Sequence, residues 1–415
     1  ATAGQSQSSS NSNYPSYVGR LEIRQPVVNF QAWAGFRAGQ AQSQYAEAEF
    51  DGRHQELMLR LYEAYADALL ARDQLAIAQA QVTALGEQMR SNDLMFKAGE
   101  GTRTDMIETR SRYNVAEATV IEAQGALGNA MRKLMALVGP GRIQGVEDLD
   151  QLRPNFSPQP EQFDDVEKWV QLALSSNSQI VAGRYSVNAA DANVERNRAG
   201  HYPTLDLIAA HTVNEADTVS TINQHNRASL VGVQLRVPLY AGGGVNASTT
   251  QAVANYERAQ AELDATRDAV VVELRNQYGL LRSNATKIKA LESAVASAQL
   301  LVEATRKSVQ GGTRVNLDVL NAEEQLYTSR RDLAQARYDY LNAYMRLRYY
   351  AGVLNIDDME TVARYFTPAD AARPGTAYSQ AKGSSKATKA TKTTKAKPPK
   401  KSATADTSKK AVAQR

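Results

Sequence analysis

The stretch GEGTRTD at residues 99–105 returns 213 residues later as GTRVNLD at residues 312–318. The same shift places Gly139 on Gly352. A repeat that extends over about forty residues decides the architecture before any local signal does. The chain is therefore predicted to consist of two similar halves, each built on one long helical hairpin. The shift also aligns two heptad-spaced series, Tyr113, Val120, Leu127 and Leu134 with Leu326, Leu333, Tyr340 and Leu347.

Each repeated turn joins a very long helix to a shorter one. A run without proline covers residues 31–93, and a helix of that length is on the order of 95 Å long. We predict one hairpin over about residues 31–138 and a second over about residues 246–352. A further helix is expected over about residues 164–199. The abundance of Ala, Gln, Asn and Ser suits long helices that pack through small side chains.

Three segments alternate apolar and polar residues and are predicted to be β-strands, at about residues 17–27, 204–213 and 228–239. The first of them presents Leu21 and Ile23 on one face, with charged residues on the other. Such strands fit a membrane β-barrel with a wet lumen. The strand pattern taken alone favours the alternative, an ordinary antiparallel sheet that is half buried in a soluble protein, because the barrel signal of a single segment is weak.

The small number of strands helps to decide between a membrane barrel and a soluble sheet only when the length of the helices is considered as well. So few strands from one chain can neither close a barrel nor cover helices of nearly 100 Å. We therefore expect several chains to contribute strands and helices to one assembly.

Composition sets further bounds. The chain has 415 residues and no Cys, which excludes disulfides, thiolate nucleophiles and cysteine metal sites. Residues 366–415 carry 12 Lys and Arg against 2 acids, a net charge of +10, so the rest of the chain carries (48−12) − (44−2) = −6. No stretch approaches the roughly 18 apolar residues of a membrane-spanning helix.

The chain is divided here into a first repeat at residues 1–152, a second at 153–365 and a Lys-rich tail at 366–415. By comparison with the second repeat, the first lacks its opening helix and strand, so we expect an N-terminal truncation. The tail has the low-complexity composition of a disordered segment. A solvated tail without a partner is the expectation for it, ahead of binding to anionic polymers.

Several motifs in this order resemble one family. They are RAGHYPTL (198–205), PLYAGG (238–243), GTRVNLDVLNA (312–322) and LAQARYDYL (333–341). The order of strand, PLYAGG, long helix and GTR turn resembles the TolC-type outer-membrane efflux proteins over about residues 17–355. The resemblance implies a mostly α fold with a membrane β-barrel, in which three chains form a twelve-stranded barrel and a twelve-helix tunnel.

The resemblance also implies a location and partners. The barrel would lie in the outer membrane of a Gram-negative bacterium, in contact with its lipids, and the helices would extend into the periplasm. The expected partners are a periplasmic adaptor (membrane fusion protein) and an inner-membrane ABC or proton-driven pump. The cargo would be an exported polypeptide or a small molecule.

The resemblance assigns a gate to the tip of the helices. Asp105 and Arg314 match a charge pair that links neighbouring hairpins, and such a bridge is a two-state latch. A second interpretation of Asp105 remains open, because Thr102 and Asp105 have the spacing of a helix cap. Asp318 matches an acid that faces the pore, although its place near a helix N-terminus is also explained by the helix dipole. Asn321 stands where the family often has a second acid, so one acidic ring is expected instead of two.

The turns at the tip match the positions where the family meets its adaptor. Their small residues allow another helical hairpin to approach closely. The alternative, compatible with the first, is that these turns need glycine for positive φ. The candidate adaptor-contact residues are Gly99, Gly101, Thr102, Gly311, Gly312 and Thr313.

No motif indicates catalysis, and we expect neither an enzyme nor a bound metal or cofactor. The four His residues are scattered without ligand spacing. The predicted function is a passive outer-membrane channel-tunnel of a tripartite export system, with type I secretion slightly favoured over small-molecule efflux. The alternative is a soluble coiled-coil scaffold or adaptor of the periplasm. A DNA-binding protein led by its basic tail is a further alternative, and nucleic acid is not an expected partner.

Overall fold

The secondary structure follows the repeat. The computed structural model of the protein describes residues 16–139, 141–143, 145–153, 156–158, 165–216 and 224–367. Residues 368–415 of the predicted Lys-rich tail lie outside the described residues. The elements are β1 (Ser16–Val28), α1 (Phe30–Ala98), α2 (Arg103–Val138), β2 (Gln151–Leu152), α3 (Val166–Ser176), α4 (Ser178–Arg198), β3 (Thr204–Ala216), β4 (Gln224–Arg236), α5 (Gly244–Gln310), α6 (Asn316–Tyr350), α7 (Ile356–Ala363) and β5 (Phe366–Thr367).

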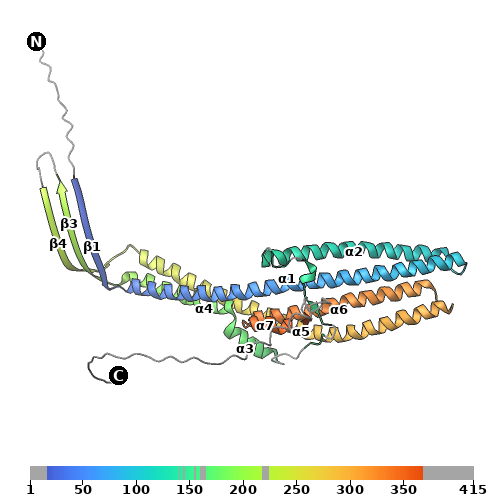
Figure 1. Cartoon of the computed structure of the whole chain (residues 1–415). Coiled ribbons are helices and arrows are strands. Elements are labelled where there is room, and N and C mark those ends of the chain that lie inside the picture. Colours follow the sequence, from blue (N-terminus) through green and yellow to red (C-terminus); the bar gives the residue numbers. More distant parts are fainter. Residues whose placement is uncertain are drawn as a thin grey trace, which may run out of the picture. The chain divides into compact units, whose positions relative to one another are not determined.

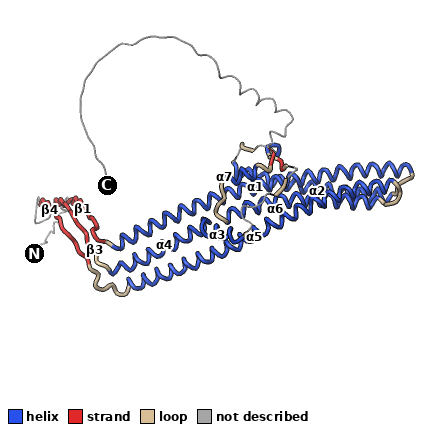
Figure 2. The backbone as a smooth tube through the Cα atoms, turned by 90° about the horizontal axis from the view of Figure 1, so that it is seen from below, coloured by secondary structure: helices blue, strands red, loops and turns tan. Residues whose placement is uncertain are grey.

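Two helical hairpins dominate the fold, as predicted. Helices α1 and α2 have 69 and 36 residues, and α5 and α6 have 67 and 35. The four helices run side by side, and α1 packs on α6 as well as on α2 (Figures 1 and 2). At 1.5 Å per residue α1 is about 100 Å long. None of the described helices is both long and apolar enough to cross a membrane.

The helices pack closely through small side chains. Of the fourteen buried residues of α1, nine are alanines, including Ala66 and Ala68. Because an alanine side chain ends at Cβ, neighbouring backbones can approach more closely there than across Leu or Phe. Larger side chains fill the centre of the core, where Leu134, Ile288 and Leu341 are almost fully buried. The predicted small-residue packing is confirmed.

Strands β1, β3 and β4 form one antiparallel sheet in that order. Its register brings Ile23, Ala209 and Val231 to one row, and the apolar sides of the three strands share one face. The other face carries charged residues, among them Glu22. The predicted amphipathic strands are therefore confirmed. Strand β4 ends at Arg236, earlier than predicted, since Pro238 has no N–H to donate to a neighbouring strand.

The helix expected over residues 164–199 is in fact two helices. Asn177 separates α3 from α4, and its side-chain Oδ1 accepts hydrogen bonds from the backbone N–H of Gln179 at 3.0 Å and of Ile180 at 3.2 Å. Its Nδ2 donates to the carbonyl of Tyr350 at 3.0 Å. This residue therefore caps α4 at the point where α6 ends.

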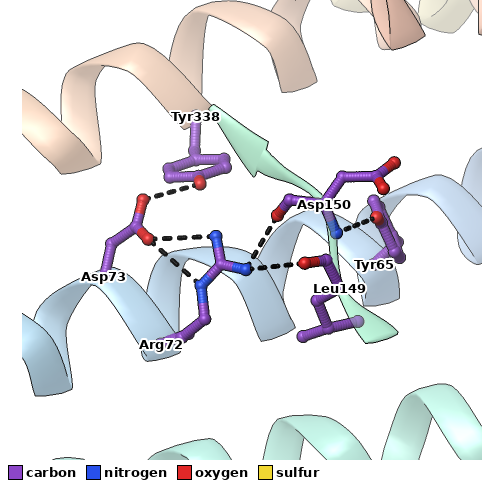
Figure 3. Close-up of polar contacts among 6 residues, drawn as sticks. All are labelled: Tyr65, Arg72, Asp73, Leu149, Asp150 and Tyr338. Atoms are coloured by element: carbon purple, nitrogen blue, oxygen red, sulfur yellow. Dashed lines mark hydrogen bonds and ion pairs between the residues drawn. The ribbon is translucent and has the colours of Figure 1, made fainter. Parts of the chain in front are cut away.

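The connector after the first hairpin is held against α1 (Figure 3). Arg72 donates from Nη1 to the carbonyls of Leu149 and Asp150, at 3.0 and 2.8 Å. The backbone N–H of Asp150 donates to the hydroxyl of Tyr65 at 3.0 Å. Burial raises the pKa of Tyr65 to about 12.

The same cluster reaches α6 (Figure 3). Asp73 pairs with the guanidinium of Arg72 at 3.2 Å and accepts a hydrogen bond from the hydroxyl of Tyr338 at 2.8 Å. Tyr338 is fully buried, and its burial together with the Asp73 carboxylate raises its pKa. These bonds tie the connector, the first hairpin and the second hairpin to one another.

A second small sheet closes the middle of the fold. Strands β2 and β5 pair antiparallel, with Leu152 opposite Phe366, which is buried. Residues 366 and 367, which the sequence grouped with the tail, therefore belong to the folded body. Helix α7, which precedes β5, is held to α6 by a buried ion pair between Arg348 and Asp358 at 2.6 Å.

Candidate functional site

The turns of the two hairpins lie at the same end of the four helices (Figures 1 and 2). Gly99 ends α1 with φ of 80°, and Gly312 follows α5 with φ of 73°. Residues with a Cβ rarely adopt this left-handed conformation. The interpretation that these two positions need glycine is confirmed.

The other candidate tip residues are also part of the turns. An added Cβ on Gly101 would lie 3.0 Å from the backbone nitrogen of Phe96, so this glycine is needed for space. Gly311 ends α5 with an ordinary negative φ. The hydroxyl of Thr313 donates to the carbonyl of Ser308 at 3.0 Å. Contact of these residues with an adaptor stays a prediction.

Asp105 caps α2. The backbone N–H of Asp105 donates to Oγ1 of Thr102 at 3.1 Å, and the backbone N–H of Thr102 donates to Oδ2 of Asp105 at 3.3 Å. The hydroxyl of Thr102 also donates to this oxygen at 2.6 Å. The expected cap is therefore confirmed. A carboxylate held in this way remains half-exposed, and one of its oxygens is free of the cap.

Asp105 and Arg314 line one cavity between the two hairpin tips. Its volume is about 610 Å³, and its walls come from the ends of α1 and α5 and the starts of α2 and α6. Within the described residues no ion pair joins Asp105 to Arg314, and Arg314 is exposed. Both residues lie at the tip of the hairpins, and the role of a latch between them stays a prediction. The proposed bond between them is not made inside one chain.

Asp318 lies in the first turn of α6, where it is half-buried. Its position fits the dipole interpretation, since an acid near a helix N-terminus is stabilised. Asn321 is exposed one turn later, and its Oδ1 accepts a hydrogen bond from Nη2 of Arg112 at 3.0 Å. Arg112 also forms an ion pair with Glu324. The sequence analysis did not identify Arg112.

A buried polar network joins the hairpins just above the tip. Thr109 of α2 is fully buried, and its Oγ1 accepts hydrogen bonds from Nδ2 of Asn92 at 2.8 Å and of Asn316 at 3.1 Å. Gln88 of α1 donates to Oδ1 of Asn316 at 2.9 Å. The sequence analysis missed this network. One signal for the network was present in the sequence. Thr109 begins a series at heptad spacing whose later members are alanines, so it is a polar residue in an otherwise apolar series.

A buried acid pairs with Arg306, one of the residues that line the cavity. Glu323 of α6 is 2% exposed and pairs with Arg306 of α5. Its other carboxylate oxygen is buried and has no hydrogen-bond partner in the part of the chain that the structure describes. The nearby Tyr327 is buried, and this burial together with the charge of Glu323 raises its pKa. Breaking the Arg306 pair would leave Glu323 buried and unpaired, which is costly.

Taken together, the sheet and the hairpins define a class of protein. One face of the sheet is apolar and exposed, with Val231 and Val233 among its residues, and the helices extend from the sheet to a tip held by polar bonds. These are features of an outer-membrane channel. The chain belongs to the outer membrane efflux protein family, whose model matches residues 1–140 and 169–353.

Relatives by sequence agree with this assignment. The chain is 41% identical to the proteases secretion protein PrtF of Dickeya chrysanthemi, over 86% of this chain and 77% of the relative. It is also 41% identical to the alkaline protease secretion protein AprF of Pseudomonas aeruginosa, over 85% and 73%. With the outer membrane protein TolC of Vibrio cholerae the identity is 28%, over 82% and 78%.

Solved structures show the same fold. The outer membrane protein VceC of Vibrio cholerae matches with a TM-score of 0.68 at 20% identity, over 82% of this chain and 87% of that one. A structure of CusC matches with a TM-score of 0.70 at 17% identity, over 81% and 83%. The family match supports an outer-membrane channel and does not support a soluble coiled-coil scaffold. The family is one of transport proteins and not of enzymes.

Proposed function

We propose that this chain is the outer-membrane conduit of a type I secretion system, through which a polypeptide leaves the cell. The observation that carries this choice is the 41% identity to two proteins named for protease secretion, against 28% to TolC. Efflux of small molecules is the second candidate, because the family is named for efflux.

In the proposed assembly three copies of the chain form one channel. The exposed apolar face of the sheet meets lipid, and the strands of three copies close a barrel. The helices form a tunnel, and the exposed apolar residues Ile107, Val115 and Ile121 on α2 are covered by a neighbouring copy. An inner-membrane ABC pump and a periplasmic adaptor complete the system.

The tip of the tunnel is the proposed gate. Asp105 pairs with Arg314 of a neighbouring hairpin, and the support for this pair is that both residues lie at the tip. Asp318 and Asn321 face the pore, and three copies of Asp318 attract cations. The adaptor contacts the turns at Gly99–Thr102 and Gly311–Thr313 and separates the hairpins.

The test is complementation in two hosts. The full-length protein is expressed in Dickeya chrysanthemi that lacks PrtF, where extracellular protease is measured, and in Escherichia coli that lacks TolC, where drug susceptibility is measured. Restored protease export without restored drug resistance is the expected result. Restored resistance without protease export would favour efflux. If trimeric, membrane-inserted protein restored neither and carried no current in planar bilayers, the conduit would be refuted.

A further inference from the structure

We propose that Arg112 is an additional gate residue, which bonds the two hairpins of one chain in the closed state and sets the charge of the pore next to Asp318. This inference rests on the proposed channel function. It concerns a residue for which neither the repeat nor the family motifs gave any signal.

The contact crosses between the two repeats. Arg112 belongs to α2 of the first hairpin, and both of its partners belong to α6 of the second. Nη2 donates to Oδ1 of Asn321 at 3.0 Å, and Nη1 pairs with the carboxylate of Glu324. The guanidinium thus holds two successive turns of α6 at once. Separation of the hairpins at the tip would have to break both bonds.

One partner of Arg112, Asn321, begins a continuous polar stripe on α6, and the other, Glu324, lies beside this stripe. The opposite side of the helix is buried in the core, with Leu326 and Leu333 among its residues. A helix face without apolar residues over this length suits a water-filled lumen. The stripe consists of residues spaced by three or four, namely Asn321, Gln325, Thr328, Asp332, Gln335 and Asp339.

Arg112 therefore adds positive charge to the pore wall. In each chain Asp318 and Glu324 together contribute a formal charge of −2 and Arg112 contributes a charge of +1, so the local net charge is −1. Three copies give −3. Removal of the arginine would change this to −6, and neutralisation of Glu324 would change it to 0. The two changes break the same ion pair, but they move the charge of the pore in opposite directions.

The strength of the bond sets the expected effect. The side chains of Arg112 and Glu324 are 34% and 57% exposed, so solvent screens the pair. Exposed pairs of this kind shift an equilibrium by about 1.4- to 5-fold. If three chains open together, the shift is multiplied to about 3- to 125-fold.

The experiment compares Arg112→Gln, Glu324→Gln and the control Arg132→Gln in planar bilayers under a KCl gradient. Arg132 lies on the same helix, and its guanidinium bonds to Asn129 of that helix. We expect Arg112→Gln and Glu324→Gln both to raise the open probability, by about 3-fold or more. Cation selectivity should rise in the first and fall in the second. Arg132→Gln should match the wild type.

A charge exchange tests direct pairing. Arg112→Glu combined with Glu324→Arg should restore the low open probability, whereas each change alone should raise it. Hydrogen exchange at the starts of α2 and α6, in detergent-solubilised full-length protein, gives a second readout that needs no current. Faster exchange in Arg112→Gln and Glu324→Gln than in Arg132→Gln would support the bond.

Two results would overturn the inference. If Arg112→Gln and Glu324→Gln both show the same open probability and the same hydrogen-exchange rates as Arg132→Gln, Arg112 is not part of the gate. If selectivity shifts while open probability and exchange do not, it only tunes the charge of the pore. A wild type that carries no current would refute the conduit, and the exchange measurement would still decide whether Arg112 holds the hairpins together.

Discussion

Replacing Thr109 by valine should loosen the tip. The hydroxyl of Thr109 donates to the carbonyl of Asp105 at 2.8 Å and accepts from Asn92 and Asn316. Its one donor and both of its lone pairs are therefore used. Valine has nearly the same shape, so the packing stays and the two buried amide N–H groups lose their acceptor.

The cost follows from this geometry. An unsatisfied buried polar group costs about 1–3 kcal/mol, so two of them cost about 2–6 kcal/mol. Since each 1.4 kcal/mol is tenfold in an equilibrium constant, hydrogen exchange by local opening should accelerate by about 30-fold or more. We expect this acceleration in the amides of residues 103–112 and 316–322, measured by mass spectrometry.

A matched control lies ten residues along the same helix. The hydroxyl of Thr119 donates only to the carbonyl of Val115, at 3.1 Å, within its own helix. Thr119→Val should therefore leave exchange at the tip unchanged. If Thr109→Val and Thr119→Val gave the same exchange rates, the buried network would not hold the hairpins together and the reasoning would fail.

The remaining predictions concern caps, turns and tyrosines. Thr102→Ala should destabilise the start of α2 by about 1 kcal/mol through loss of the cap, seen as faster exchange confined to that turn. Gly352→Ala should prevent folding or lower Tm severely, because its φ is 74° and the added Cβ would lie 2.4 Å from a backbone oxygen. Gly312→Ala has a similar φ but open space around it, so it should cost only about 1–2 kcal/mol. Burial raises the pKa of Tyr65 to about 12 and also raises the pKa of Tyr338 in the folded state. The protonated forms of both side chains therefore contribute stability that is complete below the ordinary pKa of 10.0 and is lost progressively as the pH rises above it. Chemical denaturation from pH 9 to 12 should show this loss, and a loss of equal slope in the Tyr65→Phe and Tyr338→Phe variants would contradict it.

The repeat was sufficient to predict the long-range architecture. A shift of 213 residues located both turns, both hairpins and the paired helix lengths. This was possible because heptad spacing depends only on residues that are close together in the chain, so a single sequence is enough to recognise it. The alternation in three segments likewise predicted the strands, and their register placed Ile23 and Val231 on one face. These features depend on periodicity alone.

The features that were missed depend on contacts between distant segments. The break at Asn177 has no proline or glycine to announce it, and it is fixed by a bond to Tyr350. Arg112 has the appearance of any charged residue on a helix until α6 is placed beside it. Short elements such as β5 are stable only against their partners, so two residues in sequence carry no signal for them.

The pairing of β2 with β5 has a consequence for how the protein is made. The paired residues are separated by 214 to 216 positions in the chain, from Leu152–Phe366 to Gln151–Thr367. A contact of such high sequence separation forms late, since the intervening chain must first be ordered. In the order of the chain, the connector precedes its partner strand by the whole second repeat. The small sheet therefore closes only after the second repeat has been ordered, as one of the last parts of the fold to form.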